Sequence, residues 1–125
     1  MADVLNLYIE AGDSQIWELL WQTEETLAPI DISGCTALME FKRSYSDQDA
    51  LLVLTTENGG IEILEDPGWA AINITGDRSI LLGSDRVTSG VHDLLFFFDG
   101  VPKKPVKGRW KCSPLASKSW LDGAL

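Results

Sequence analysis

His92 is the only histidine in the sequence, and it is therefore the first residue to consider for catalysis. In a serine hydrolase, a histidine takes the proton of the nucleophile and is itself held by a carboxylate. Asp93 is adjacent, but successive residues of a strand point to opposite faces, so these two side chains cannot bond to each other within a strand. Ser89 lacks the Gly-x-Ser-x-Gly context of a nucleophile elbow. We interpret His92 as an imidazole at the edge of the core that bonds to the backbone.

Adjacent carboxylates occur at Glu24-Glu25 and at Glu65-Asp66. Glycosidases use two carboxylates at a fixed separation in a cleft, but these pairs lie in polar segments typical of solvated loops. Residues 47–49 lack the glycine and the distal glutamate of a calcium loop. The sequence has no glycine motif for phosphates or dinucleotides and no cysteine and histidine cluster at zinc spacing. We expect no catalytic residue, no cofactor and no metal, and we interpret the protein as a non-enzyme.

Two cysteines, Cys35 and Cys112, lie far apart in the sequence. The first residues, Met1 to Asn6, lack the basic and apolar regions of a secretory signal, so we expect the protein to fold in a cytoplasm. In a reducing compartment such cysteines are usually small, buried apolar residues. A disulfide and a metal site are the alternatives.

Tryptophan is frequent, with five residues in 125. Trp17, Trp21 and Trp110 fall at inward positions of expected strands, where large aromatic side chains fill the space between packed sheets. Trp69 follows a Pro-Gly turn, and Trp120 lies beyond the last expected strand. Exposed tryptophan is typical of protein interfaces and of surfaces on which sugar rings stack, so glycan binding is kept as an alternative.

Strands must position these residues, because apolar side chains recur at every second position along most of the chain. About eight such segments alternate with turns, at the spacing of about 8–12 residues that is typical of a β-sandwich or a small barrel. The expected strands are residues 4–10, 15–21, 35–42, 51–55, 61–64, 69–75, 91–99 and 106–113. The expected shared core includes Trp17, Leu19, Trp21, Met39, Phe41, Leu94 and Phe96.

Three connections carry specific predictions. Asn58-Gly59 can supply the positive φ angles of a tight turn and predicts a hairpin tip between the two neighbouring strands. Residues 77–84 form either a short helical turn or a loop. Residues 101–105 contain two prolines and two lysines, and we expect a loop there.

The chain has 125 residues, 45% of them apolar, and a formal net charge of −9. This length fits one domain, and the apolar fraction is too high for a disordered chain. The longest apolar run, residues 94–98, is far shorter than the roughly 20 residues that a membrane helix needs, so we expect no membrane. The negative charge argues against nucleic acid as a partner. Residues 1–100 carry 4 basic and 18 acidic side chains, whereas residues 101–125 carry 6 basic and 1 acidic.

This uneven charge, together with the alternation of the last two strands, predicts a contact surface. In the strand at 91–99 two of the outward residues are apolar, which favours a covering partner. In the strand at 106–113 the outward residues are basic and face solvent or a partner. The candidate interface consists of Leu95 and Phe97 from the first strand, Lys107, Arg109 and Lys111 from the second, and Trp120 and Leu121 from the tail.

Several motifs follow one another in a familiar order. A Gly-Asp turn at residues 12–13 precedes a strand that ends in Trp21, and residues 29–37 then read Pro-Ile-Asp-Ile-Ser-Gly-Cys-Thr-Ala. Residues 54–61 read Leu-Thr-Thr-Glu-Asn-Gly-Gly-Ile. Near the end, residues 90–94 read Gly-Val-His-Asp-Leu, and residues 108–114 read Gly-Arg-Trp-Lys-Cys-Ser-Pro. Over about residues 4–114, this order resembles the immunoglobulin-like β-sandwich proteins of tailed-bacteriophage virions, including the N-terminal domain of baseplate upper proteins. His92 stands where that family usually has tyrosine.

The resemblance implies an all-β, immunoglobulin-like antiparallel sandwich of about 7–9 strands, and we assign this domain to residues 1–115. Residues 116–125 have no counterpart in that family, and we interpret them as a docking or oligomerisation arm. It implies a structural protein of the tail, baseplate or neck, assembled in the bacterial cytoplasm as a homo-oligomer or array on other virion proteins. A capsid decoration protein of the same fold is one alternative. A carbohydrate-binding or receptor-binding module is the other.

Overall fold

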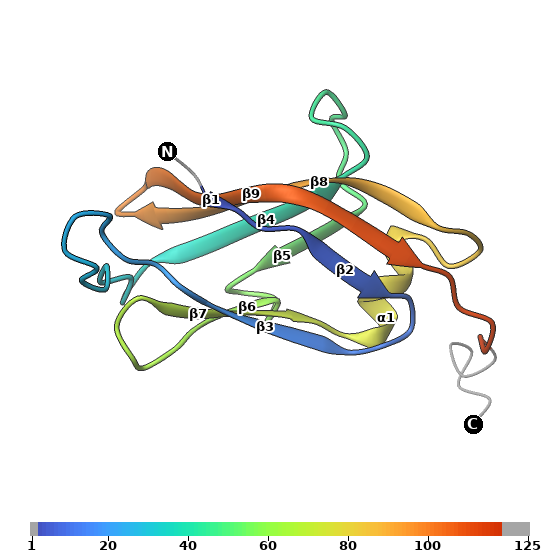
Figure 1. Ribbon diagram of the computed structural model, residues 1–125, viewed down its shortest axis with the longest axis horizontal. Helices are drawn as coiled ribbons and strands as arrows, with labels where there is room; N and C mark the ends of the chain where they lie inside the picture. Colours follow the sequence, from blue (N-terminus) through green and yellow to red (C-terminus); the bar gives the residue numbers. More distant parts are fainter. Residues whose placement is uncertain (1–2, 119–125) are drawn as a thin grey trace.

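The computed structural model describes residues 3–118, which form two β-sheets packed face to face (Figure 1). The larger sheet has the order β1-β9-β8-β4-β5, with β2 also paired to β9, and the smaller sheet has the order β3-β7-β6. The strands are β1 (Asp3–Val4), β2 (Leu7–Glu10), β3 (Gln15–Leu20), β4 (Thr36–Lys42), β5 (Leu52–Thr55), β6 (Ile61–Ile63), β7 (Trp69–Ile74), β8 (Thr88–Phe98) and β9 (Val101–Ser113). A short helix, α1 (Gly76–Ser79), and a 3₁₀ turn (Ile80–Leu82) connect β7 to β8.

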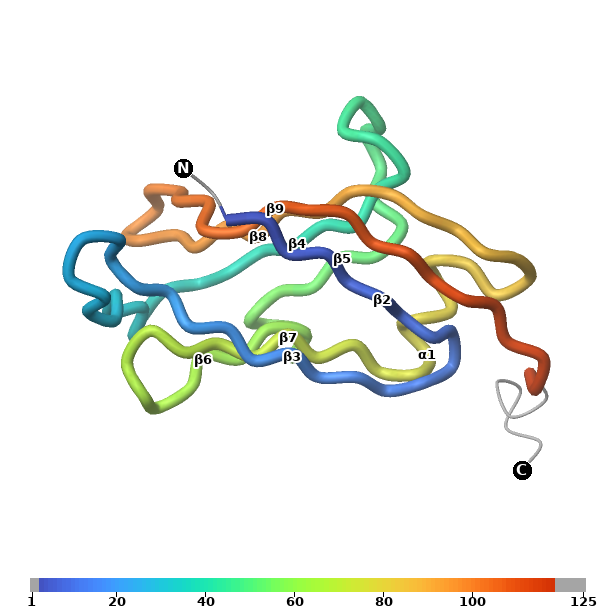
Figure 2. The backbone as a smooth tube through the Cα atoms, viewed as in Figure 1, coloured from blue at the N-terminus to red at the C-terminus, as the bar shows by residue number. Residues whose placement is uncertain are grey.

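This architecture confirms the predicted immunoglobulin-like sandwich. The chain changes sheet after β2, after β3, after β5 and after β7, which places β3, β6 and β7 opposite β4, β5, β8 and β9, as in immunoglobulin-like folds. Neighbouring strands are antiparallel, except that β1 and β2 run parallel to β9. Figure 2 shows residues 3–10, in blue, beside the last strand, in orange and red.

The core lies between the two sheets and is formed by the side chains that point inward from both of them. The seven residues expected to share a core do so: Met39, Phe41, Leu94 and Phe96 are fully buried, and Trp17, Leu19 and Trp21 pack against them with part of their surface exposed. Trp21 stacks on Phe96, with ring centroids 5.6 Å apart. Aromatic stacking of this kind stabilises beyond simple burial of area.

The predicted hairpin at Asn58-Gly59 is wrong. A turn does form there, with Gly59 at φ +80°, but β5 pairs only with β4, and β6 pairs only with β7. The Asn58 side chain closes the turn, because its Oδ1 accepts hydrogen bonds from the backbone N–H groups of Thr55 and Gly60, both at 2.9 Å. The chain thereby crosses from the larger sheet to the smaller one. Alternation of apolar residues defines a strand's inward face but does not encode which sheet the strand joins.

The predicted loop at 101–105 is also wrong, because these residues form the first part of β9. A two-residue turn, Asp99-Gly100, has both φ angles positive and joins β8 to β9 as a tight hairpin. The ladder register then shifts between Leu94 and Phe96, so that β9 contains an extra residue there. Prolines are tolerated in strands at open edges and at bulges, and β1 pairs with β9 only from Val106 onward.

Residues beyond β9 remain attached to the sandwich as far as the structure describes them. The backbone N–H of Leu115 donates to the carbonyl of Ser84 at 3.0 Å, and Lys118 forms an ion pair with Asp85. The predicted interface residues Trp120 and Leu121 lie outside the described residues. Within residues 3–118, no helix has the length and apolar character needed to cross a membrane.

Candidate interaction surface

His92 is buried in the larger sheet, with 1% of its surface exposed. Its Nε2 lies 2.7 Å from the carbonyl oxygen of Leu5, so Nε2 carries the proton and donates it in this hydrogen bond. Its ring packs beside that of Phe41, with centroids 5.6 Å apart. The expectation of an imidazole bonded to backbone is thus confirmed.

The hydrogen bond from His92 lies at a break in the pairing of the N-terminal segment with β9. This segment, residues 3–10, contains β1 and β2 and is called the first strand below. Regular pairing stops after Val4 and resumes at Leu7. Between them, the Asn6 side-chain oxygen accepts the hydrogen bond from the Arg109 N–H at 3.1 Å, which frees the Leu5 carbonyl to turn inward. The histidine therefore fastens the first strand to the sheet from inside the core.

We expect the free energy of unfolding to fall as the pH decreases below about 6.5. Burial lowers the pKa of His92 from its usual 6.5, more than the Leu5 hydrogen bond and the Asp93 charge raise it. The unfolded chain therefore binds a proton at a higher pH than the folded chain, and stability decreases by at most about 1.4 kcal/mol per pH unit for this one proton. Urea unfolding at a series of pH values measures this slope.

The His92→Gln variant is the control, because it keeps an N–H donor and cannot titrate. Its unfolding free energy should vary less than that of the wild type between about pH 7 and pH 5. Three carboxyl groups also have lowered pKa values, because each accepts a hydrogen bond: Asp31 from Ser33, Asp77 from Thr75 and Asp85 from Lys118. Their protonation therefore changes the free energy of unfolding only in more acidic solution. Identical slopes in both proteins would contradict the assignment.

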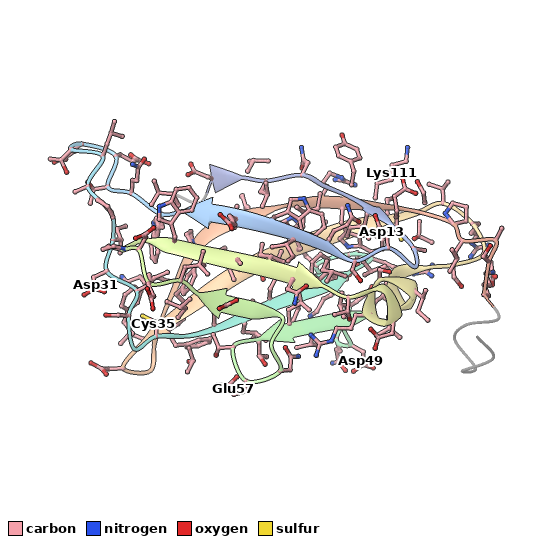
Figure 3. All side chains as sticks on the ribbon, turned by 90° about the horizontal axis from the view of Figure 1, so that it is seen from below. Asp13, Asp31, Cys35, Asp49, Glu57 and Lys111 are labelled. Carbon is pink, nitrogen blue, oxygen red and sulfur yellow. The ribbon has the colours of Figure 1, made fainter. Side chains whose placement is uncertain are left out.

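The outward surface of the larger sheet carries the predicted basic residues. Lys107, Arg109 and Lys111 of β9 are all exposed, whereas the alternate residues Gly108, Trp110 and Cys112 are buried. Figure 3 shows Lys111 projecting away from the ribbon. We call this outward surface of β9, β8, β4 and β5 the basic face.

Two carboxylates also lie on the basic face, but lysines neutralise them. Asp93 is 3.3 Å from Lys104, and Glu40 is 4.0 Å from Lys42. No ion pair among residues 3–118 involves the three predicted cations of β9. Exposed ion pairs of this kind contribute little to stability.

Beside these cations lies an apolar area. The predicted residues Leu95 and Phe97 are half-buried, and they lie in register opposite Leu38 and Thr36 of β4. Val53 of β5 extends the apolar area and is exposed. The structure therefore places five of the seven predicted interface residues on one face.

Sequence reasoning missed two apolar members of this face, Leu38 and Val53, and an aromatic side chain that borders it, Tyr8 of β2. Leu38 alternates with Met39 and Val53 alternates with Leu54, so the period of two already signals that they point outward. Tyr8, which is 73% exposed, lies opposite Lys111 because β2 pairs with β9. That pairing joins opposite ends of the chain and has no local signal.

The described residues contain no group of three or more histidine, cysteine, aspartate or glutamate side chains that could hold a metal ion. Cys35 and Cys112 are free thiols, and burial raises the pKa of each. Trp69 is half-buried on the outward side of the smaller sheet. Comparison with protein-family models and with curated proteins finds no match for this chain.

Proposed function

We propose that this chain is a structural subunit of a bacteriophage virion, in the tail, baseplate or neck, and that it assembles through its basic face. One observation carries the proposal: cations without an ion-pair partner among residues 3–118 and half-buried apolar side chains share the outward surface of one sheet. Protein interfaces combine an apolar centre with a charged rim in this way. The order of sequence motifs, which resembles that of virion sandwich proteins, supports the choice of assembly.

Charged residues at such a contact act mainly on register and association rate. The apolar residues Leu38, Leu95 and Phe97 would supply the area removed from water, and the cations of β9 would select an acidic partner surface. The protein works in this scheme as a building block, by contact with further copies and with other virion proteins.

We expect the purified protein to form oligomers at about 0.01 M salt and to dissociate at about 1 M salt, where the screening length falls from about 30 Å to about 3 Å. Light scattering over a range of protein concentrations measures this change. The double variant Lys107→Ala/Lys111→Ala should weaken assembly. The matched control Arg43→Ala/Arg86→Ala removes two exposed cations outside the strands and should not. A wild-type protein that stays monomeric in both salts at high concentration would contradict the proposal.

A further inference from the structure

The outward surface of the smaller sheet has the opposite charge from the basic face. Glu18 of β3 and Glu62 of β6 both lie opposite Ala71 of β7, so the two carboxylates flank one small residue in the same row. The segments Gln15–Leu20, Ile61–Ile63 and Trp69–Ile74 contain no lysine or arginine. We call this surface the acidic face.

Apolar side chains accompany the carboxylates. Ile16 is 65% exposed, and Leu20 and Trp69 are half-buried and lie opposite each other in register. An exposed isoleucine next to a partly exposed tryptophan on a strand surface favours a covering partner. The acidic face thus has the same two components as the basic face, with the charge inverted.

The two faces lie on opposite sides of the sandwich, because each is the outward surface of one of the two layers (Figure 1). Pairing a face with its own copy would bring like charges together, which disfavours association. Pairing one face with the other brings opposite charges and apolar areas together. Such a contact is heterologous, and each copy keeps one free face for the next copy.

We infer that the basic face of one copy docks on the acidic face of the next, so that a second copy of this chain is the partner. The inference rests on the proposed function and specifies its partner surface. This docking would explain the uneven charge along the sequence. Strand β9 holds five of the ten basic residues and no acidic residue, and in the docked pair it lies against the smaller sheet of the next copy, whose strands contain no basic residue.

Two charge-reversal variants test this pairing. Arg109→Glu/Lys111→Glu makes both faces acidic, and Glu18→Lys/Glu62→Lys makes both faces basic; all four side chains are exposed. We expect each variant alone to assemble about 100-fold more weakly than the wild type or worse, because like charges then meet. Mixed in equal amounts, the two variants should assemble again, in alternation. Light scattering of each protein and of the mixture measures this.

The control variant Asp49→Lys/Glu57→Lys changes the net charge as much as Glu18→Lys/Glu62→Lys does. Asp49 and Glu57 lie in connections between strands, away from Lys111 (Figure 3). This control should assemble like the wild type. Circular dichroism establishes that each variant is folded before it is mixed.

The outcomes separate the inference from the function on which it rests. A monomeric wild type contradicts the proposed function. If the wild type assembles and Glu18→Lys/Glu62→Lys assembles equally well, then the basic face binds something other than the acidic face, and the inference is wrong. Folded variants that fail to assemble when mixed also overturn it. Recovery of assembly in the mixture alone supports it.

Discussion

Replacing Trp110 by alanine is expected to lower the free energy of unfolding by about 3–5 kcal/mol, as other large buried aromatic truncations do. The side chain is 1% exposed and is among the largest fully buried groups of residues 3–118. Its Nε1 donates to the carbonyl oxygens of Lys42 and Val91, both at 3.1 Å, and so links β9 to β4 and β8. The alanine variant loses the packing and leaves both acceptors without this donor.

Urea unfolding of three variants measures the effect. Trp110→Phe keeps most of the ring volume but removes the donor, so it should lose less stability than Trp110→Ala. Trp69→Ala, at a half-buried position, should lose the least. Since a domain of this size has a total stability of about 5–15 kcal/mol, the alanine variant should unfold at a much lower denaturant concentration. An equal loss in Trp69→Ala and Trp110→Ala would contradict this account of the core.

Gly108→Ala is expected to destabilise the larger sheet by about 1–3 kcal/mol or more, the usual range for overpacking. A Cβ at this position would lie 1.9 Å from the carbonyl oxygen of Leu5, which is a backbone atom and cannot move aside by changing a rotamer. The same oxygen accepts the hydrogen bond from His92. The methyl group would therefore push the first strand away and leave the buried imidazole without an acceptor.

Hydrogen exchange locates this effect, because the loss should concentrate in one strand. Amides of residues 7–10 should exchange faster in Gly108→Ala than in the wild type, while those of β7 in the other sheet should change less. Lys107→Ala, on the exposed side of the same strand, is the control. Unchanged exchange in residues 7–10 would show that the glycine is not needed for the close approach.

Strand positions could be predicted from the sequence because inward apolar residues alternate with outward residues along each strand. Met39 and Phe41 on β4 and Leu94 and Phe96 on β8 follow that rule, and all four are buried. The same alternation could not identify strand partners. Because β5 and β6 both direct leucine and isoleucine to the same core, their sequences are equally compatible with one hairpin or with two separate sheets.

The basic face was partly predictable for the same reason. Lys107, Arg109 and Lys111 alternate with buried residues of a single strand, so one segment of sequence was enough to place them together. The acidic face was not predicted, because Glu18 and Glu62 lie 44 positions apart and share a row only through β7. A row across a sheet depends on register, which local sequence does not specify.

The position of the first strand beside the last has a consequence for how the chain is made. Asn6 and Arg109, which are joined by a hydrogen bond, are separated by 103 positions in the sequence. At a synthesis rate of about 5–20 residues per second, about 5–20 s pass between their appearance on the ribosome. During that interval Leu7 and Ile9 have no strand to pair with, and β8 lacks both its neighbour β9 and the Trp110 anchor. A nascent chain that lacks β9 leaves both β2 and β8 without this neighbour, so the larger sheet closes only after β9 has been made.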